Sequence, residues 1–191
     1  RNQLITVTEP PANLGGPDRI SRFTYDAAGN MTRDTRGTTQ YNYTISAAGR
    51  IARVAIGTSV RADYTYDGKS RLASRVTQNQ AGAGTTRLFH DNDNRVIAEV
   101  NATGTTVREY IWLDDLPVAV LDGTTSTANP TLFFVHADHL NRPVAMSNAA
   151  KAWVWRAQYE PFGAVHQIVG PAANDSRFPG QWFQLEAGLA Y

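Results

Sequence analysis

The sequence of 191 residues contains no cysteine, which excludes disulfide bonds, thiolate metal sites and a cysteine nucleophile. No apolar run approaches the length of a membrane span, and the N-terminus lacks the charged-then-apolar order of a signal peptide. The 18 basic and 17 acidic residues are spread without runs and give a formal net charge of +1. This balance provides no electrostatic patch for nucleic acid or an anionic membrane surface.

The sequence also lacks the periodicity of an amphipathic helix. Apolar and polar residues alternate along it, which is the pattern of a β-strand. Ala62, Tyr64 and Tyr66 fall on one face of an extended segment. The same alternation is expected to place a second set on one face: Trp153, Trp155, Ala157 and Tyr159. The pattern predicts an all-β fold of antiparallel strands. Helix-like turns are expected only as short pieces, around Pro117 and over residues 185–189.

A turn motif recurs along the chain and divides it into repeats. In its clearest copy Tyr25 precedes Asp26, which can bond the backbone ahead, and Gly29 can take a positive φ. Further copies are Ile45 to Gly49, Tyr66-Asp67 to Ser70, and His90-Asp91 to Asn94, and weaker copies begin at Trp112, Ala137 and Tyr159. The period of roughly 22 residues predicts repeated antiparallel hairpins, with two strands and two turns each, that form a twisted, spiralling β-ribbon. Second turns are expected at positions such as Ala102 to Gly104 and Asn148 to Lys151.

Three ordered motifs in the C-terminal third resemble segments of a known family. They are His136-Ala137-Asp138-His139-Leu140-Asn141-Arg142-Pro143, Trp155-Arg156-Ala157-Gln158-Tyr159-Glu160-Pro161-Phe162-Gly163 and Arg177-Phe178-Pro179-Gly180-Gln181-Trp182. They resemble His-x-Asp-His-Leu-Gly-x-Pro, Trp-Arg-Ala-x-Tyr-x-Pro-Phe-Gly and Arg-Phe-Pro-Gly-Gln-aromatic of the Rhs family. That family comprises bacterial polymorphic toxins related to Tc-toxin shell subunits and to the YD shells of teneurins. Asn141 stands where Gly is usual, and Asn tolerates left-handed geometry.

The resemblance implies that the ribbon is part of a hollow shell that encloses and helps deliver a C-terminal toxin domain. It implies the remainder of the shell and the toxin as partners, with secretion-apparatus components or a chaperone as further candidates, and no cofactor. It also implies production in the bacterial cytoplasm and delivery by a secretion system. The family's aspartyl autoprotease motif, Asp-Pro-x-x-Gly-Arg, would come shortly after Tyr191, so we assign autoproteolysis to no residue here. The chain itself is expected to be non-catalytic.

We expect one YD-repeat region over residues 1–191. Residues 1–17 form a partial repeat and loop, residues 18–131 the YD repeats, and residues 132–191 the C-terminal segment of the Rhs core. The segment 1–7 resembles the second strand of a hairpin, which favours a fragment of a longer protein. A structural role in the repeats is expected for Tyr25, Asp26, Gly29, Gly49, Tyr66, Asp67, Asp91, Asn94, His136, Asp138, His139, Pro143, Trp155, Arg156, Tyr159, Pro161, Phe162, Gly163, Phe178, Pro179 and Gly180.

Two groups of polar residues suggest chemistry, and a structural interpretation is favoured for both. His136 and Asp138 would share a strand face, but His139 would point away, so a hydrogen-bonded turn is favoured over a metal site. Adjacent Asp114 and Asp115 would point to opposite faces of a strand, so solvated turn acids are favoured over a glycosidase pair.

Aromatic residues at period two leave a second function open. Rings such as Tyr64 and Trp153 offer flat apolar faces on which a sugar could stack, although cross-strand packing is the favoured interpretation. The alternative function is therefore a cell-surface adhesion or carbohydrate-binding module, with a glycan as its ligand. Exposed aromatics would favour that alternative, and buried aromatics would favour the shell.

Overall fold

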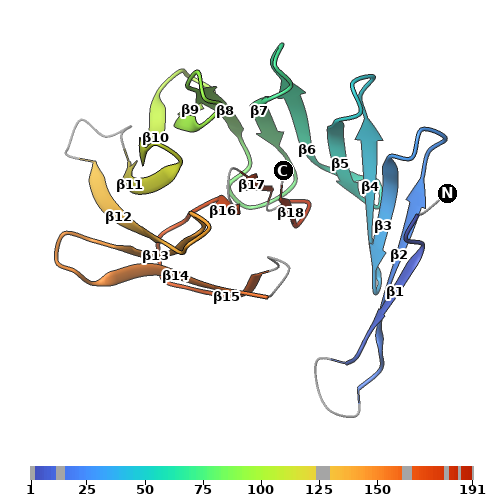
Figure 1. Cartoon of the computed structure of the whole chain (residues 1–191). Coiled ribbons are helices and arrows are strands. Elements are labelled where there is room, and N and C mark those ends of the chain that lie inside the picture. The colour runs from blue at the N-terminus through green and yellow to red at the C-terminus, as the bar shows by residue number, and fades with distance from the viewer. Residues whose placement is uncertain are drawn as a thin grey trace. The chain divides into compact units, whose positions relative to one another are not determined.

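The computed structural model describes residues 3–11, 16–123, 130–160, 165–178, 181–184 and 186–190. The chain forms two compact units, Arg1–Gly84 and Thr85–Tyr191, which are described separately. The described residues of both units are extended strands joined by turns (Figure 1). No helix in the described part of the chain is long and apolar enough to span a membrane. The predicted all-β class with antiparallel hairpins is thus confirmed.

The first unit is a run of antiparallel strands in which each strand pairs with its neighbours in sequence. The strands are β1 (Thr6–Glu9), β2 (Arg19–Tyr25), β3 (Met31–Arg36), β4 (Thr39–Ile45), β5 (Ile51–Ile56), β6 (Ser59–Tyr66) and β7 (Leu72–Thr77). Tight turns at Gly37 and Gly57, both with positive φ, connect β3 to β4 and β5 to β6 at one end of the strands. Longer turns connect the strands at the opposite end.

The second unit repeats this sequential antiparallel pairing. Its main strands are β8 (Thr85–His90), β9 (Val96–Asn101), β10 (Thr106–Leu113), β11 (Leu116–Asp122), β12 (Thr131–Ala137), β13 (Pro143–Ser147), β14 (Trp153–Tyr159) and β15 (Val165–Val169). A separate small sheet follows, made of β16 (Ser176–Phe178), β17 (Gln181–Gln184) and β18 (Leu189–Ala190). In Figure 1 this small sheet lies on the inner side of the curve of β10 to β15, and β16 contacts β13.

The core of the first unit is a row of side chains across three strands. Tyr43 of β4 pairs with Val54 of β5, and Val54 pairs with Ala62 of β6. Val54 and Ala62 are completely buried although they belong to a single layer, and Tyr43 and Tyr64 are buried beside them. Tyrosines and small apolar residues thus alternate across neighbouring strands, as expected for cross-strand packing.

Two expectations about local structure are wrong. Trp153 and Trp155 lie on opposite faces, with 54% and 1% of their surface exposed, because the register shifts between Met146 and Ser147. Ser147 pairs with Trp153 while Met146 pairs with Trp155, so the intervening Val154 is an extra, bulged residue. Pro117 does not form a helix-like turn but lies inside β11, where the register shift at Ile111 and Trp112 accommodates it.

Candidate functional site: the turns that join the strands

The strands are joined by a five-residue turn that an aspartate organises, and Asp67 shows it fully. Its backbone accepts from the Ser70 amide at 2.9 Å and donates to the Arg71 carbonyl at 2.9 Å. Its Oδ1 accepts from the amides of Lys69 and Arg71, both at 2.9 Å. Its Oδ2 accepts from Arg71 Nε at 2.7 Å, and the same guanidinium forms an ion pair. One carboxylate thus satisfies the donors that the turn leaves unpaired.

The same geometry recurs at Asp91 and Asp138. Asp91 accepts from the Asp93 and Arg95 amides at 2.9 Å, and Asp138 accepts from the Leu140 and Arg142 amides at 3.0 Å. In both turns the arginine at the fifth position also bonds the carboxylate through Nε. At Asp26 the partner is Asn30, whose backbone and side-chain nitrogens both donate to the carboxylate at 2.9 Å.

The fourth residue has a left-handed backbone in these turns and in three further turns, which begin at Ser46, Asn101 and Asn148. Glycine adopts this conformation at no steric cost and asparagine at a small one, whereas other side chains clash with their own carbonyl. The fourth residues and their φ angles are Gly29 (97°), Gly49 (74°), Ser70 (62°), Asn94 (71°), Gly104 (88°), Asn141 (60°) and Lys151 (62°). The expected tolerance of Asn141 in place of glycine is therefore observed directly in its backbone angle.

The turn hydrogen bonds change the acidity of the aspartates. The Asn30 side chain and backbone lower the pKa of Asp26, and the Arg71 backbone amide together with its guanidinium lowers the pKa of Asp67. At Asp91 and Asp138 desolvation acts to raise the pKa, but the bonds from Arg95 and Arg142 outweigh it, so both pKa values are lowered. The turns therefore favour the charged carboxylate.

At four places along the chain an aromatic residue at the end of a strand ties its hairpin to the preceding one. The hydroxyl of Tyr66 donates to the carbonyl of Ile51 at 2.8 Å, and that of Tyr159 donates to the carbonyl of Pro143 at 2.9 Å. Trp112 does the same through its indole nitrogen, which donates to the carbonyl of Val96 at 2.9 Å. Ile51, Val96 and Pro143 all directly follow a five-residue turn. Tyr25 makes the equivalent bond to the carbonyl of Leu4 at 2.8 Å.

A shift in strand register accompanies each of these aromatic residues. The pairing shifts between Thr24 and Tyr25, between Thr65 and Tyr66, between Ile111 and Trp112, and between Gln158 and Tyr159. A bulge re-aims the side chain and increases the local twist of the strand. The bulge therefore explains how a residue at a strand end can reach the backbone of the neighbouring strand.

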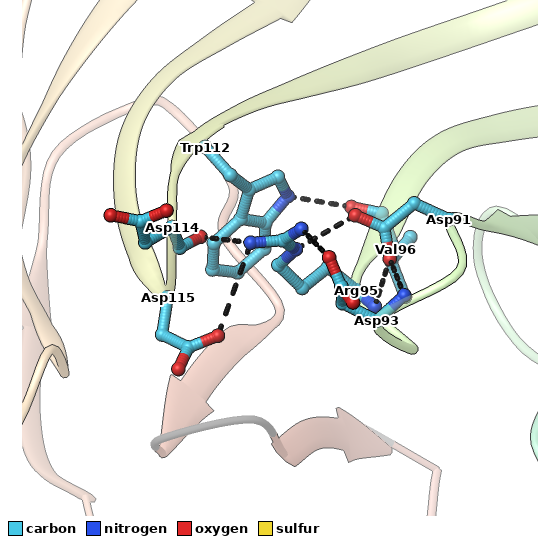
Figure 2. Close-up of polar contacts among 7 residues, drawn as sticks. All are labelled: Asp91, Asp93, Arg95, Val96, Trp112, Asp114 and Asp115. Atoms are coloured by element: carbon cyan, nitrogen blue, oxygen red, sulfur yellow. Dashed lines mark hydrogen bonds and ion pairs between the residues drawn. The ribbon is translucent and has the colours of Figure 1, made fainter.

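The arginine at the fifth position reaches forward to the next hairpin. Arg142 lies over the ring of Tyr159, 4.3 Å from its centroid. Arg95 bonds Asp91 and Asp93 of its own turn, donates to the carbonyl of Asp114, and forms an ion pair with Asp115 at 4.0 Å (Figure 2). Two connections of the second unit are thus made twice, by Trp112 and Tyr159 reaching back and by Arg95 and Arg142 reaching forward.

The structure corrects the predicted repeat at Trp112 and reveals the same turn at two sites predicted only as second turns. Leu113 pairs with Leu116, so Asp114 and Asp115 form a two-residue turn and not a five-residue one. Conversely, Asn101 accepts from the amides of Thr103 and Thr105 at 3.0 Å, as an aspartate does in the motif. Asn148 accepts from the Ala152 amide at 3.0 Å. The sequence patterns Asn-x-x-Gly and Asn-x-x-Lys indicate these turns. They lack the aromatic residue before the turn and the arginine at its fifth position, so they do not match the predicted motif.

The remaining predicted residues lie in varied positions. His136 is exposed, bonds Ser147 Oγ at 2.9 Å and meets the Trp153 ring edge-on, while His139 is exposed in the turn. Pro143 and Trp155 are buried, Arg156 is exposed, and Phe178 lies in β16. Pro161, Phe162, Gly163, Pro179 and Gly180 lie outside the described residues. In the described part of the chain, no cluster of three or more metal-ligating side chains occurs.

A buried polar network lies in the second unit and was not predicted. The hydroxyl of Tyr110 donates to Glu99 Oε1, and Arg108 pairs with Glu99 at 3.5 Å and with Asp122 at 3.2 Å. Burial, followed by the charge of Glu99, raises the pKa of Tyr110 well above its usual value. The edge of Trp182 in β17 meets the Tyr110 ring at a centroid distance of 5.0 Å. These residues come from β9, β10, β11 and β17 and carry no local motif, so only the fold brings them together.

Gly170 is another residue that the sequence did not single out. It has a φ of 118°, and a Cβ built on it would lie 2.2 Å from the carbonyl oxygen of Val154. The segment Gly170 to Ala172 thus passes close to the backbone of β14, and the Ala172 amide donates to the same Val154 oxygen at 3.0 Å. The dipeptide Gly170-Pro171 was the available signal for this close approach.

These features define a class: a β-repeat protein whose consecutive hairpins are tied through their turns. The family model of the teneurin YD-shell matches residues 13–174. The chain belongs to the teneurin YD-shell family, and the predicted membership of the YD-repeat shells is confirmed.

Two bacterial toxins are relatives of the chain. Double-stranded DNA deaminase toxin A of Burkholderia cenocepacia (strain H111) is 25% identical over 236 residues, covering 91% of this chain and 16% of the toxin. Toxin protein Tse5 of Pseudomonas aeruginosa is 27% identical over 221 residues, covering 96% of this chain and 17% of the toxin. The chain therefore spans about a sixth of the length of these curated relatives.

A solved structure shares the fold. A Tc holotoxin pore from Photorhabdus luminescens matches with a TM-score of 0.57 and 15% identity, over 91% of this chain and 11% of that chain. At this identity the likeness shows the fold alone.

Proposed function

We propose that this chain is a structural encapsulation module, part of a β-shell that encloses and helps deliver a C-terminal toxin domain. The observation that carries the proposal is the repeated tie from each aromatic residue to the backbone after the preceding turn. The toxin relatives support the proposed cargo, because each is several times longer than this chain. The module is non-catalytic in this proposal, and its effect on the cargo is steric.

The contacts suit a wall better than a reaction centre. The five-residue turns use their polar groups internally: the Asp67 carboxylate accepts from two amides and one guanidinium, and the Tyr66 hydroxyl is bonded to Ile51. Hydrogen-bonded turns are also poor substrates for proteases, which cleave exposed, unpaired loops. The proposed role of the motif residues, from Tyr25 to Gly180, is therefore to fix the curvature and continuity of the wall.

The proposed partners follow from the same role. They are the remainder of the shell and the toxin domain, with secretion-apparatus components or a chaperone during delivery. The bacterial toxin relatives support production in the bacterial cytoplasm followed by delivery out of the cell. We also propose that residues 18–131 form the YD repeats and residues 132–191 the C-terminal segment of this core.

Protection of the cargo in the intact parent protein tests the proposal. A protease added to the folded parent is expected to leave the C-terminal domain uncut while it digests the same domain expressed alone. The double variant Tyr66→Phe with Tyr159→Phe removes two ties and is expected to speed cleavage of the enclosed domain. Tyr43→Phe is the matched control, because the buried Tyr43 hydroxyl faces the Arg36 guanidinium and makes no tie to a carbonyl after a turn among the described residues. Equal cleavage of enclosed and free cargo would contradict encapsulation.

Carbohydrate binding is a second candidate because of one residue, Trp153. Trp153 is 54% exposed, whereas Tyr43, Tyr64, Tyr110 and Trp155 are buried. A glycan array separates the two functions: binding that is lost in Trp153→Ala would support a carbohydrate-binding module. The absence of binding by the wild-type chain would leave the shell role as the better supported one.

A further inference from the structure

The small sheet β16–β18 presents one face to the main sheet of the second unit. Ser176 of β16 pairs with Trp182 of β17, and the Phe183 amide bonds the Asp175 carbonyl at 2.7 Å. This register places Asn174 opposite Gln184. Directly opposed and alternate residues share a face, so Asn174, Ser176, Trp182 and Gln184 point the same way. All of them are buried, and Trp182 contacts Tyr110 of β10.

Apart from its tryptophan, this buried face is polar and its hydrogen bonds are incomplete. Asn174 Nδ2 and both side-chain amide atoms of Gln184 are buried without a hydrogen-bond partner among the described residues. Asn174 Oδ1 is used locally, by the Ser176 amide at 3.1 Å. Burying an amide without partners is unfavourable relative to leaving it in water, so docking of this face carries a penalty at three atoms.

The opposing face of the main sheet has no such deficit among its described residues. Tyr110 bonds Glu99, and Arg108 is shared between Glu99 and Asp122, so the network is satisfied within β9, β10 and β11. If the small sheet left, the main sheet would lose the aromatic contact of Trp182 but none of these polar bonds. The small sheet, in contrast, would regain water at Asn174 and Gln184.

The chain before β16 is fixed, which defines where a movement would begin. Gly170 lies against the backbone of Val154, and the Ala172 amide bonds the Val154 carbonyl. On the outer side of the small sheet, Arg177 lies over Phe183, 4.1 Å from the ring centroid, and its Nε donates to the Asn174 carbonyl at 3.2 Å. Burial lowers the pKa of Arg177, so this half-buried charge would also gain from hydration.

We propose that the small sheet β16–β18 is a detachable element, which undocks from β10 and β13 after Ala172 while β8 to β15 stay folded. The aromatic contact of Trp182 with Tyr110 is opposed by three amide atoms that have no hydrogen-bond partner among the described residues, which lowers the free energy of undocking. The proposal concerns the second unit alone and does not depend on what the shell encloses. Its consequence is that chain following residue 176 can move away from the inner face without unfolding of the wall.

Hydrogen exchange on the full chain, followed by mass spectrometry, tests this. A sheet of three such short strands is not stable without packing, so it loses its own hydrogen bonds when it undocks. The amides of Phe183 and Gly188, which bond Asp175 and Gln184 within the small sheet, are therefore expected to exchange at least about tenfold faster than those of β10 to β14. Their exchange rate should not change when a low concentration of denaturant is added, as expected for a local opening. Equal protection of the small sheet and of β10 to β14 would overturn the proposal.

A pair of matched variants tests the physical cause. Gln184→Met keeps the shape but removes the unpartnered amide, and should slow exchange of the small sheet about tenfold. Gln181→Met makes the same change at an exposed position of β17 and should leave the rate unchanged. Trp182→Ala should raise exchange in the small sheet and leave β10 to β14 protected. Faster exchange in Gln184→Met would overturn the proposal, because it would mean that the amide is held by hydrogen bonds.

Discussion

The hydroxyl of Tyr66 lies 2.8 Å from the carbonyl oxygen of Ile51, the first residue after the preceding five-residue turn. Tyr66→Phe removes this donor and keeps the ring, so we expect the free energy of unfolding to fall by about 0.5–1.5 kcal/mol. Tyr43→Phe should cost less, since its buried hydroxyl faces the Arg36 guanidinium and donates to no backbone carbonyl among the described residues. Urea unfolding followed by tryptophan fluorescence measures both. An equal loss in the two variants would show that the tie contributes nothing specific.

The Asp138 turn separates the role of the side-chain oxygen from that of the charge. Asp138→Asn keeps the acceptor for the Leu140 and Arg142 amides but loses the ion pair with Arg142, as in the natural Asn148 turn. We expect Asp138→Ala to lower the free energy of unfolding by about 1–3 kcal/mol and Asp138→Asn by less than half of that. Thermal unfolding of both variants measures the ratio. Equal losses would assign the whole effect to the charge.

The lowered pKa values of the turn aspartates predict acid sensitivity. The folded carboxyls of Asp67, Asp91 and Asp138 bind protons less tightly than in the unfolded chain, where the ordinary pKa is 3.8. Their contribution to stability is therefore complete above that pKa and is lost as the pH falls through the lower folded values. Urea midpoints should decline as the pH is lowered below about 5, and the Asp138→Asn variant should decline less steeply. A constant midpoint down to the acid limit would refute the assignment.

Gly170 is expected to tolerate no side chain. Gly170→Ala would place a Cβ 2.2 Å from the Val154 carbonyl oxygen. We expect the free energy of unfolding to fall by about 3 kcal/mol and the segment Gly170 to Ala172 to be displaced from β14. Gly68→Ala is the control, because a Cβ at that position would meet nothing within 4 Å and the φ of Gly68 is not positive. That control should be neutral or raise stability by about 0.4–1 kcal/mol. Chemical denaturation of the two variants gives the comparison.

Lys151 occupies a turn position that favours glycine. Its φ is 62°, so Lys151→Gly should relieve backbone strain and raise the free energy of unfolding by up to about 1 kcal/mol. Lys69 lies in the same type of turn, one position earlier, without a positive φ, and Lys69→Gly should be destabilising. Melting temperatures of the two variants should therefore shift in opposite directions. A loss in Lys151→Gly would mean that the lysine side chain stabilises the turn.

The sequence predicted the elements whose causes are local. Asp67, Ser70 and Arg71 lie within five residues, so the turn that they form is visible as a pattern. The opposite faces of Trp153 and Trp155 could not be predicted, because the bulge at Val154 arises from how β14 pairs with β13. Alternation assumes a regular register, and one extra residue reverses it.

Long-range contacts were equally invisible. The contact between Tyr110 and Trp182 joins residues that no periodicity relates, and the network of Glu99 and Arg108 depends on strand pairing. The Asn101 and Asn148 turns fall between these cases. Their geometry is local, but the sequence motif was defined by an aromatic-Asp pair, whereas the backbone of the turn requires only a side-chain oxygen.

The five-residue turn places few demands on sequence. Its first residue supplies a side-chain oxygen, a role filled here by Asp67, Asn148 or Ser46, and its fourth adopts a left-handed backbone, a role filled by Gly29, Asn94 or even Lys151. Two such loosely specified positions in about 20 residues leave the other positions free to mutate. A wall of this kind can therefore diverge until its repeats are hardly recognisable as copies, while the hairpins that they close keep the same register.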